Sequence, residues 1–102
     1  MSNTERRLNK LFVTLNTEYH VHGDRCVAVR DRRSGAWHGE HSALGGRLLG
    51  AFSRCGQGGF NPEHQPGKGH HLVFIRDRRD VVTSPLEGVE RPPRAALLRY
   101  AR

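Results

Sequence analysis

The first third of the chain alternates short apolar segments with turn residues, which is typical of antiparallel strands. Residues 11–15 are rich in β-branched and aromatic side chains, and residues 19–22 alternate apolar with polar positions. Residues 23–24 form a two-residue turn signal before a third apolar segment at residues 26–30. A fourth segment begins at residues 36–38. We therefore predict a β-meander in this part of the chain.

The middle of the chain supports two alternatives. Four apolar side chains fall at helical spacing: Leu44, Leu48, Leu49 and Phe52. Each glycine inside a helix costs about 1 kcal/mol relative to Ala, and three lie here: Gly45, Gly46 and Gly50. A turn at the paired glycines followed by a strand over residues 47–53 explains them equally well. Helix and strand both stay open from the sequence.

Residues 54–69 contain mainly Gly, Gln, Pro, His and Asn, with Phe60 as the one apolar anchor. This composition predicts a long flexible loop. Loops of this length in compact domains are functional or disordered.

The last third predicts a hairpin and a helical tail. Residues 71–75 are the strongest strand in the chain, residues 78–80 turn it, and residues 81–84 return. A short strand at residues 88–90 precedes two prolines, and residues 94–102 contain good helix formers.

These elements predict a mainly β fold. The length of 102 residues corresponds to one domain, residues 1–102, with a core over about 11–91, the loop 54–69 and a tail 92–102. Leu, Ile, Val and Phe account for 23 residues, so the core is thin. We expect about six or seven short strands in a small barrel or a strongly bent antiparallel sheet, with room for one helix.

The net charge of +7 favours association with polyanions such as nucleic acid, acidic proteins or anionic membranes. Of the 17 basic residues, all but Lys10 and Lys68 are Arg. A coding sequence rich in G and C produces the same bias without selection for binding, so the origin of the charge is open.

Other features point to a cytoplasmic protein. The N-terminal residues 1–13 lack the apolar run of a secretory signal, and no stretch of 18 apolar residues predicts a membrane-spanning helix. Cys26 and Cys55 do not form a disulfide framework.

Two identical tetrads each close an apolar segment: Arg30-Asp31-Arg32-Arg33 and Arg76-Asp77-Arg78-Arg79. Equivalent strand ends of a closed sheet can lie on one rim, where their cations contact phosphates. Our leading hypothesis is therefore a nucleic-acid or other polyanion site made of Arg30, Arg32, Arg33, Arg76, Arg78 and Arg79. In the alternative, both tetrads are solvated hairpin tips whose Asp neutralises neighbouring Arg.

Binding of unpaired bases also requires exposed aromatic side chains for stacking. The candidates are Tyr19, Trp37, Phe60 and Tyr100. Trp37 precedes two polar residues, so we expect it to be partly exposed and to join the nucleic-acid site. It is equally suited to covering one end of a barrel.

The sequence predicts no metal site, no cofactor and no enzyme. His20 and His22 lie two positions apart on a predicted strand, but no metal motif supplies the further ligands that a site needs. Glu40, His41 and Ser42 are acid, base and nucleophile types in a row, yet adjacent side chains point apart and do not make a triad.

Residues 40–45 resemble the Asp/Asn-x-Ser-x-x-Gly motif of PilZ domains, with Glu40 in place of the Asp. PilZ domains are small β-barrels that bind cyclic di-GMP, and an upstream Arg-x-x-x-Arg wraps the ligand. Residues 6–10 of this chain supply Arg-x-x-x-Lys. Lys does not reproduce bidentate recognition by Arg. The resemblance implies, as an alternative function, a cyclic-dinucleotide receptor whose ligand contacts Arg6, Ser42 and Gly45.

A second resemblance is to a diffuse set of small bacterial proteins of unknown activity. They open with a strand like Asn16-Thr17-Glu18-Tyr19 and close with one like Thr83-Ser84-Pro85. The resemblance implies a small β-barrel and no particular activity.

A third class of function is a protein-interaction or homo-oligomerisation module. In that case an apolar strip in the tail, with Leu97, Leu98 and Tyr100, docks the partner.

Overall fold

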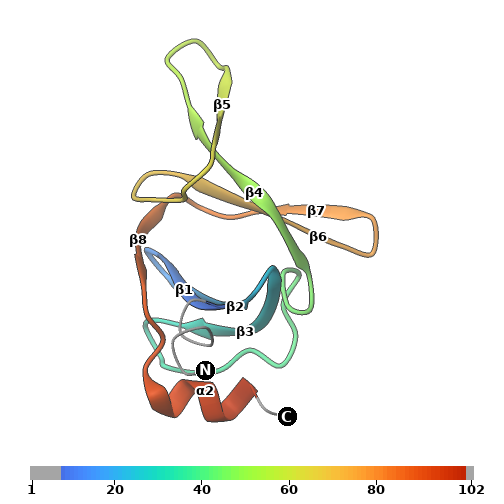
Figure 1. The fold of residues 1–102 in the computed structure, drawn as a ribbon, viewed down its shortest axis with the longest axis vertical. Coiled ribbons are helices and arrows are strands. Elements are labelled where there is room, and N and C mark those ends of the chain that lie inside the picture. The colour runs from blue at the N-terminus through green and yellow to red at the C-terminus, as the bar shows by residue number, and fades with distance from the viewer. Residues whose placement is uncertain (1–7, 101–102) are drawn as a thin grey trace.

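The computed structural model describes residues 8–100 as a mainly β fold with a short C-terminal helix (Figure 1). Its elements are β1 (Asn9–Thr14), β2 (Thr17–His22), β3 (Arg25–Asp31), β4 (Arg47–Arg54), β5 (Phe60–Glu63), β6 (His71–Arg76), β7 (Arg79–Val82), β8 (Leu86–Glu90) and α2 (Arg94–Tyr100). All strand pairs are antiparallel. The predicted fold class is confirmed, with eight strands in place of six or seven. The helix is not long and apolar enough to cross a membrane.

The strands form one strongly bent sheet in the order β7-β6-β4-β3-β2-β1-β8, and β5 pairs with β4 beside this path. The bend places β1, β2 and β3 in one layer and β4, β6 and β7 in a second (Figure 1). Strands β3 and β4 pair at Arg25 and Arg47, and backbone hydrogen bonds of Cys26 with Gly45 and Gly46 extend this junction. Leu86 exchanges backbone hydrogen bonds with Gly69 and His70, which draws β8 toward β6 without closing a barrel. The bent-sheet alternative is therefore the correct one.

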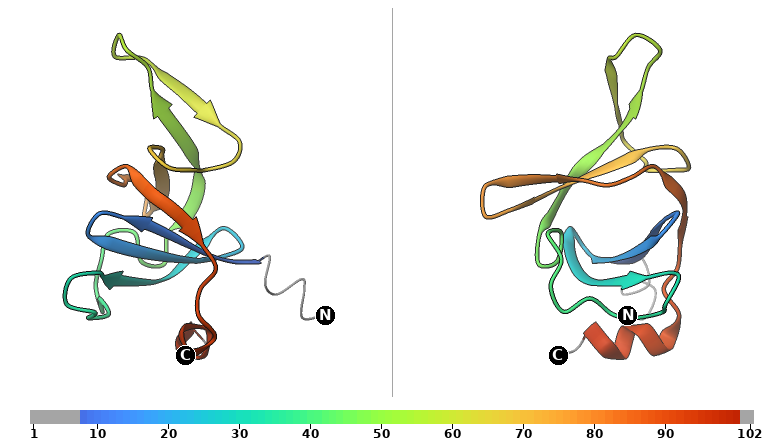
Figure 2. Two further views of the ribbon diagram at one scale, coloured as in Figure 1. Left: turned by 90° about the vertical axis from the view of Figure 1, so that its left-hand side faces the viewer. Right: turned by 180° about the vertical axis from the view of Figure 1, so that it is seen from behind.

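The core lies between the two layers. Phe12, Val21 and Val29 come from the first layer, and Leu72 and Phe74 from the second, each at most 1% exposed. The Tyr19 ring stacks on Phe74 with their centroids 5.7 Å apart, and burial raises the Tyr19 pKa. Each such side chain contributes about 1.5–3 kcal/mol when it is fully buried. Helix α2 lies on the outer side of the first layer (Figure 2) and buries Ala96.

The middle of the chain is a turn and a strand, so the helical alternative is wrong. Residues 42–45 form the turn, in which Gly45 has φ +82°. A Cβ on Gly46 would lie 2.9 Å from the Ala43 carbonyl oxygen, so only glycine fits there. Gly50 lies at a register shift in β4, which explains a glycine in a strand.

The prediction of one continuous loop over residues 54–69 is wrong for its central part. Strand β4 runs to Arg54 and pairs with β5, giving a hairpin that projects from the body (Figure 2). Phe60 packs edge-to-face on Phe52 with ring centroids 4.9 Å apart, and Ser53 Oγ donates to Glu63 Oε2 at 2.6 Å. These contacts between neighbouring strands order a segment whose local composition favours a loop.

Candidate anion-binding site

The first tetrad holds the end of β3 against neighbouring turns. Arg32 Nη1 donates to the Thr14 carbonyl oxygen at 2.7 Å, and Arg30 Nε donates to the Gly35 carbonyl oxygen at 2.9 Å. The Asp31 carboxylate accepts the Arg33 backbone N–H at 2.9 Å, and this bond lowers the pKa of Asp31. Two of the three guanidinium groups of this tetrad thus stabilise the fold.

Trp37 lies beside the first tetrad. It pairs with Arg30 in an isolated bridge, and the Arg30 guanidinium lies 5.4 Å from its ring centroid. The centroid of the His20 ring lies 5.0 Å from that of Trp37. Trp37 is half-buried by these contacts.

The second tetrad forms the β6–β7 hairpin. Arg76 pairs directly with Arg79, which leaves Asp77 and Arg78 as the two loop residues. Both have positive φ, 52° and 66°, as a type I′ turn requires. That turn normally contains Asn-Gly or Asp-Gly, so the Arg78 backbone is strained.

The structure does not bring the two tetrads together. The register places Ile75 opposite Arg47, and Arg47 opposite Arg25, so the second tetrad adjoins the start of β3. The first tetrad lies at the other end of β3, about 20 Å away at the usual rise of a strand. Viewed from behind, the end of β3 and the β6–β7 hairpin point to opposite sides (Figure 2). The expected single rim is absent from the described residues.

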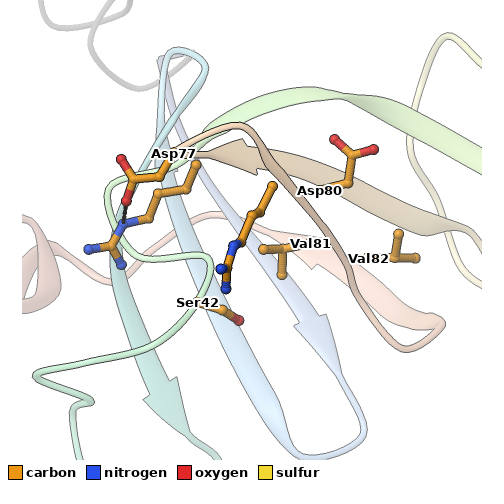
Figure 3. A pocket seen from close by; sticks show the side chains of 7 residues that line it. Ser42, Asp77, Asp80, Val81 and Val82 are labelled. Atoms are coloured by element: carbon orange, nitrogen blue, oxygen red, sulfur yellow. Dashed lines mark ion pairs between the residues drawn. The ribbon is translucent and has the colours of Figure 1, made fainter.

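The second tetrad borders an open cavity of about 720 Å³. Because directly opposed residues share a face, the Arg76 and Arg79 side chains lie on the same side of the hairpin. Ser42 forms the facing wall (Figure 3). Arg76 Nη1 donates to the His41 carbonyl oxygen at 3.1 Å, and its Nε lies 3.6 Å from Asp77 Oδ2. Two guanidinium groups and a hydroxyl thus line one hollow, together with the carboxylates of Asp77 and Asp80. The guanidinium and hydroxyl groups are donors that phosphate oxygens accept.

The loop that carries Ser42 is held by His41. Its Nδ1 accepts the Ala43 backbone N–H at 3.0 Å, and its ring meets Tyr19 edge-to-face at 5.7 Å. Burial and the neighbouring His38 lower the His41 pKa, which favours the neutral ring that can accept this hydrogen bond. His41 therefore has a positioning role for the Ser42 turn.

Ser42 and Gly45, from the PilZ-like motif, line an adjacent cavity of about 530 Å³ together with Arg76. Arg6 lies outside the described residues. Residues assigned to two separate hypotheses from the sequence, Arg76 and Ser42, thus meet at one place. The turn at residues 42–45 brings them together. The sequence is equally consistent with a helix and a strand in this segment, so it does not show that Ser42 lies in a turn.

An exposed apolar surface covers the outer face of β4, β5, β6 and β7, opposite the core. We call it the outer strip, and it forms a shallow groove of about 530 Å³ lined chiefly by Leu49, Phe52, Phe60, Pro62, Val73 and Val82. Leu49, Phe60 and Val82 are 53%, 61% and 51% exposed. The uninterrupted apolar run at residues 72–75 indicates this surface in the sequence, because a strand with one solvated face alternates apolar and polar residues.

The environments of the remaining candidate site residues are explained by the fold. His20 is 1% exposed with Nε2 3.2 Å from Glu18 Oε1, and its pKa is lowered by burial, whereas His22 is on the surface. A register shift between His20 and Val21 accounts for the different environments. Among the described residues no group of three or more His, Cys, Asp or Glu forms a metal site. Leu97 is half-buried, and the side chains of Leu98 and Tyr100 lie outside the described part.

Comparisons with protein-family models, curated proteins and solved structures find no match to this chain.

Proposed function

We propose that this chain is a non-enzymatic module that binds the phosphate groups of a polyanion, most simply nucleic acid, in the cavity where Arg76 and Arg79 face Ser42. The observation that supports the proposal is the register of the β6–β7 hairpin, which sets two arginines directly opposite each other beside that cavity. Asp77 partly compensates the charge of Arg76, since its Oδ2 lies 3.6 Å from Arg76 Nε. A bound phosphate would compensate the charge of Arg79 in the same way.

The backbone of the same hairpin supports the proposal. Arg78 occupies a left-handed conformation that costs a non-glycine residue about 1 kcal/mol relative to glycine. Strain of this kind concentrates at functional sites. The turn presents a third Arg at the tip of the hairpin, where glycine would satisfy the backbone better.

The net charge of the whole chain also favours binding of a polyanion. A net charge of +7 attracts a polyanion over distances of about 10 Å at 0.1 M salt. Arg forms paired hydrogen bonds to phosphate oxygens. Arg79 can provide such bonds beside Ser42, and Arg76 adds positive charge to the same cavity.

The test is a fluorescence-anisotropy titration with labelled mixed-sequence DNA and RNA at about 50 and 200 mM salt. We expect binding that weakens steeply with salt. Arg79→Ala should weaken it about tenfold and lower the salt slope by about one, because one phosphate contact is lost. Arg33→Ala, in the first tetrad, is the matched control and should change affinity less than about twofold. Absence of binding at low salt, or equal effects of both substitutions, would exclude the proposed site.

A second candidate function is a receptor for a cyclic dinucleotide, as the PilZ-like motif implies. It is favoured by the position of Ser42 and Gly45 beside Arg76. Isothermal titration with cyclic di-GMP distinguishes the two. Saturable micromolar binding that Ser42→Ala weakens, with little affinity for longer nucleic acid, would favour the receptor.

A further inference from the structure

The outer strip and the proposed phosphate site meet at the edge strand β7. Val73 and Val82 share one face of the β6–β7 hairpin, whereas Arg76 and Arg79 share the opposite face. Asp80 and Val82, in the edge strand β7, line both the strip and the cavity that contains Arg76 and Arg79. A ligand that crosses β7 therefore touches charged groups on one side and apolar groups on the other. This combination restricts the chemistry of the ligand.

The aromatic part of the strip is a supported platform. Phe60 is 61% exposed, and the edge-to-face contact with Phe52 supports its ring. Phe52 is stacked in turn on His71, with centroids 5.0 Å apart and an interplanar angle of 15°. His71 is fixed by a hydrogen bond between Nδ1 and the Thr83 carbonyl oxygen at 2.9 Å. The exposed ring is thus braced by two rings beneath it.

A positive charge adjoins this platform. Arg54 is the register partner of Phe60, and its guanidinium lies 6.0 Å from the ring centroid. Positive charge beside an exposed aromatic ring is the pattern that binds unpaired bases, because the base stacks while the cation contacts phosphate.

We infer that the outer strip binds the bases of single-stranded nucleic acid whose backbone is held by Arg76 and Arg79. The inference rests on the proposed function for the backbone contact. A duplex keeps its base faces stacked inside and offers the strip only charged and polar surface. Unpaired bases, in contrast, can stack on Phe60 and cover Leu49 and Val82.

Charge complementarity favours nucleic acid over a second copy of this chain. Two copies bring together two bodies of net charge +7, which repel each other, whereas a phosphate chain compensates that charge. Arg54 at one end of the strip and Arg79 next to its other end carry the same sign.

The test compares a labelled mixed-sequence single strand with its annealed duplex by fluorescence anisotropy. We expect tighter binding of the single strand. Phe60→Ala should weaken that binding about fivefold or more and leave duplex binding and the salt slope unchanged. Leu15→Ala, at a 69% exposed position on the β1–β2 turn, is the matched control and should change neither. A strand containing 2-aminopurine should lose fluorescence when it stacks on the protein, and Phe60→Ala should abolish that change.

The possible failures are distinguishable. This inference would be overturned by equal affinity for single strand and duplex, if Phe60→Ala has no effect and Arg79→Ala weakens both. That result would still support the phosphate site. Loss of all binding would remove the proposed function as well. Concentration-dependent dimerisation in sedimentation experiments, abolished by Val82→Asp, would assign the strip to contacts between copies and also overturn the inference.

Discussion

The same four residues, Arg-Asp-Arg-Arg, end β3 and span the β6–β7 turn, yet the two copies have different surroundings. At the end of β3, Arg30 and Arg32 donate to backbone carbonyl groups of neighbouring turns. In the β6–β7 hairpin, Arg76 and Arg79 oppose each other beside an open cavity. The difference shows that an Arg-rich tetrad has no fixed function. Residues 32–34 form the turn of the first copy, whereas Asp77 and Arg78 alone form that of the second. This difference in turn length decides which groups the side chains meet.

The largest expected effect on stability is at Arg32, in the first copy. Arg32→Ala removes the 2.7 Å bond to Thr14 and a 3.4 Å contact to the Leu15 carbonyl oxygen. We expect it to lower the free energy of unfolding by about 1–2 kcal/mol, as for a hydrogen bond from a charged group. Arg33→Ala should change it by less than about 0.5 kcal/mol. Urea denaturation measures both, and equal values would contradict a structural role for the first tetrad.

Arg78→Gly should raise the free energy of unfolding, in contrast to Arg32→Ala. Glycine adopts the left-handed turn without the Cβ penalty, so we expect a gain of about 1 kcal/mol in the free energy of unfolding. Affinity for nucleic acid should fall at the same time, because a cation is removed from the hairpin tip. A more stable variant that binds as tightly as the unchanged chain would show that Arg78 has no part in binding.

Asp80→Asn should increase the affinity of the second tetrad for nucleic acid. Asp80 lines both the phosphate cavity and the outer strip, where its carboxylate repels a phosphate chain. We expect affinity for a single strand to rise by about two- to fivefold, at the scale of one partly screened charge. Glu87→Gln, at an exposed position of β8, provides the comparison. If both substitutions act alike, only the net charge matters.

The smallest expected effect is a pH dependence at the first tetrad. The bond from the Arg33 N–H lowers the Asp31 pKa below its ordinary value of 3.8. A depressed pKa in the folded state contributes stability that is present above the ordinary value and is lost as pH falls through the folded pKa. The stability advantage of the unchanged chain over Asp31→Asn should therefore vanish in strong acid. An advantage that persists unchanged to pH 2 would contradict this account.

The sequence predicted the fold class because strand pattern and turn residues are local signals. Residues 71–75 and 26–30 coincide closely with β6 and β3. Strand β5 was missed because Asn61 and Pro62 have low strand propensity, and pairing with β4 orders them.

The candidate site was only partly predictable. Arg76 and Arg79 were identified as basic residues, but their opposition depends on a two-residue turn at Asp77 and Arg78, which has no glycine or asparagine signal. The turn predicted at residues 78–80 would give another register. The proximity of Ser42 depends on the bend of the sheet, which no local pattern encodes.

The most direct test of the central claim is a ¹H–¹⁵N correlation titration with a short mixed-sequence single strand. It reports on both tetrads at once through their backbone amides. We predict that the largest shifts occur at residues 76–80 and at Ser42, with little change at residues 31–35. Shifts confined to residues 31–35, or spread evenly over all exposed arginines, would contradict it.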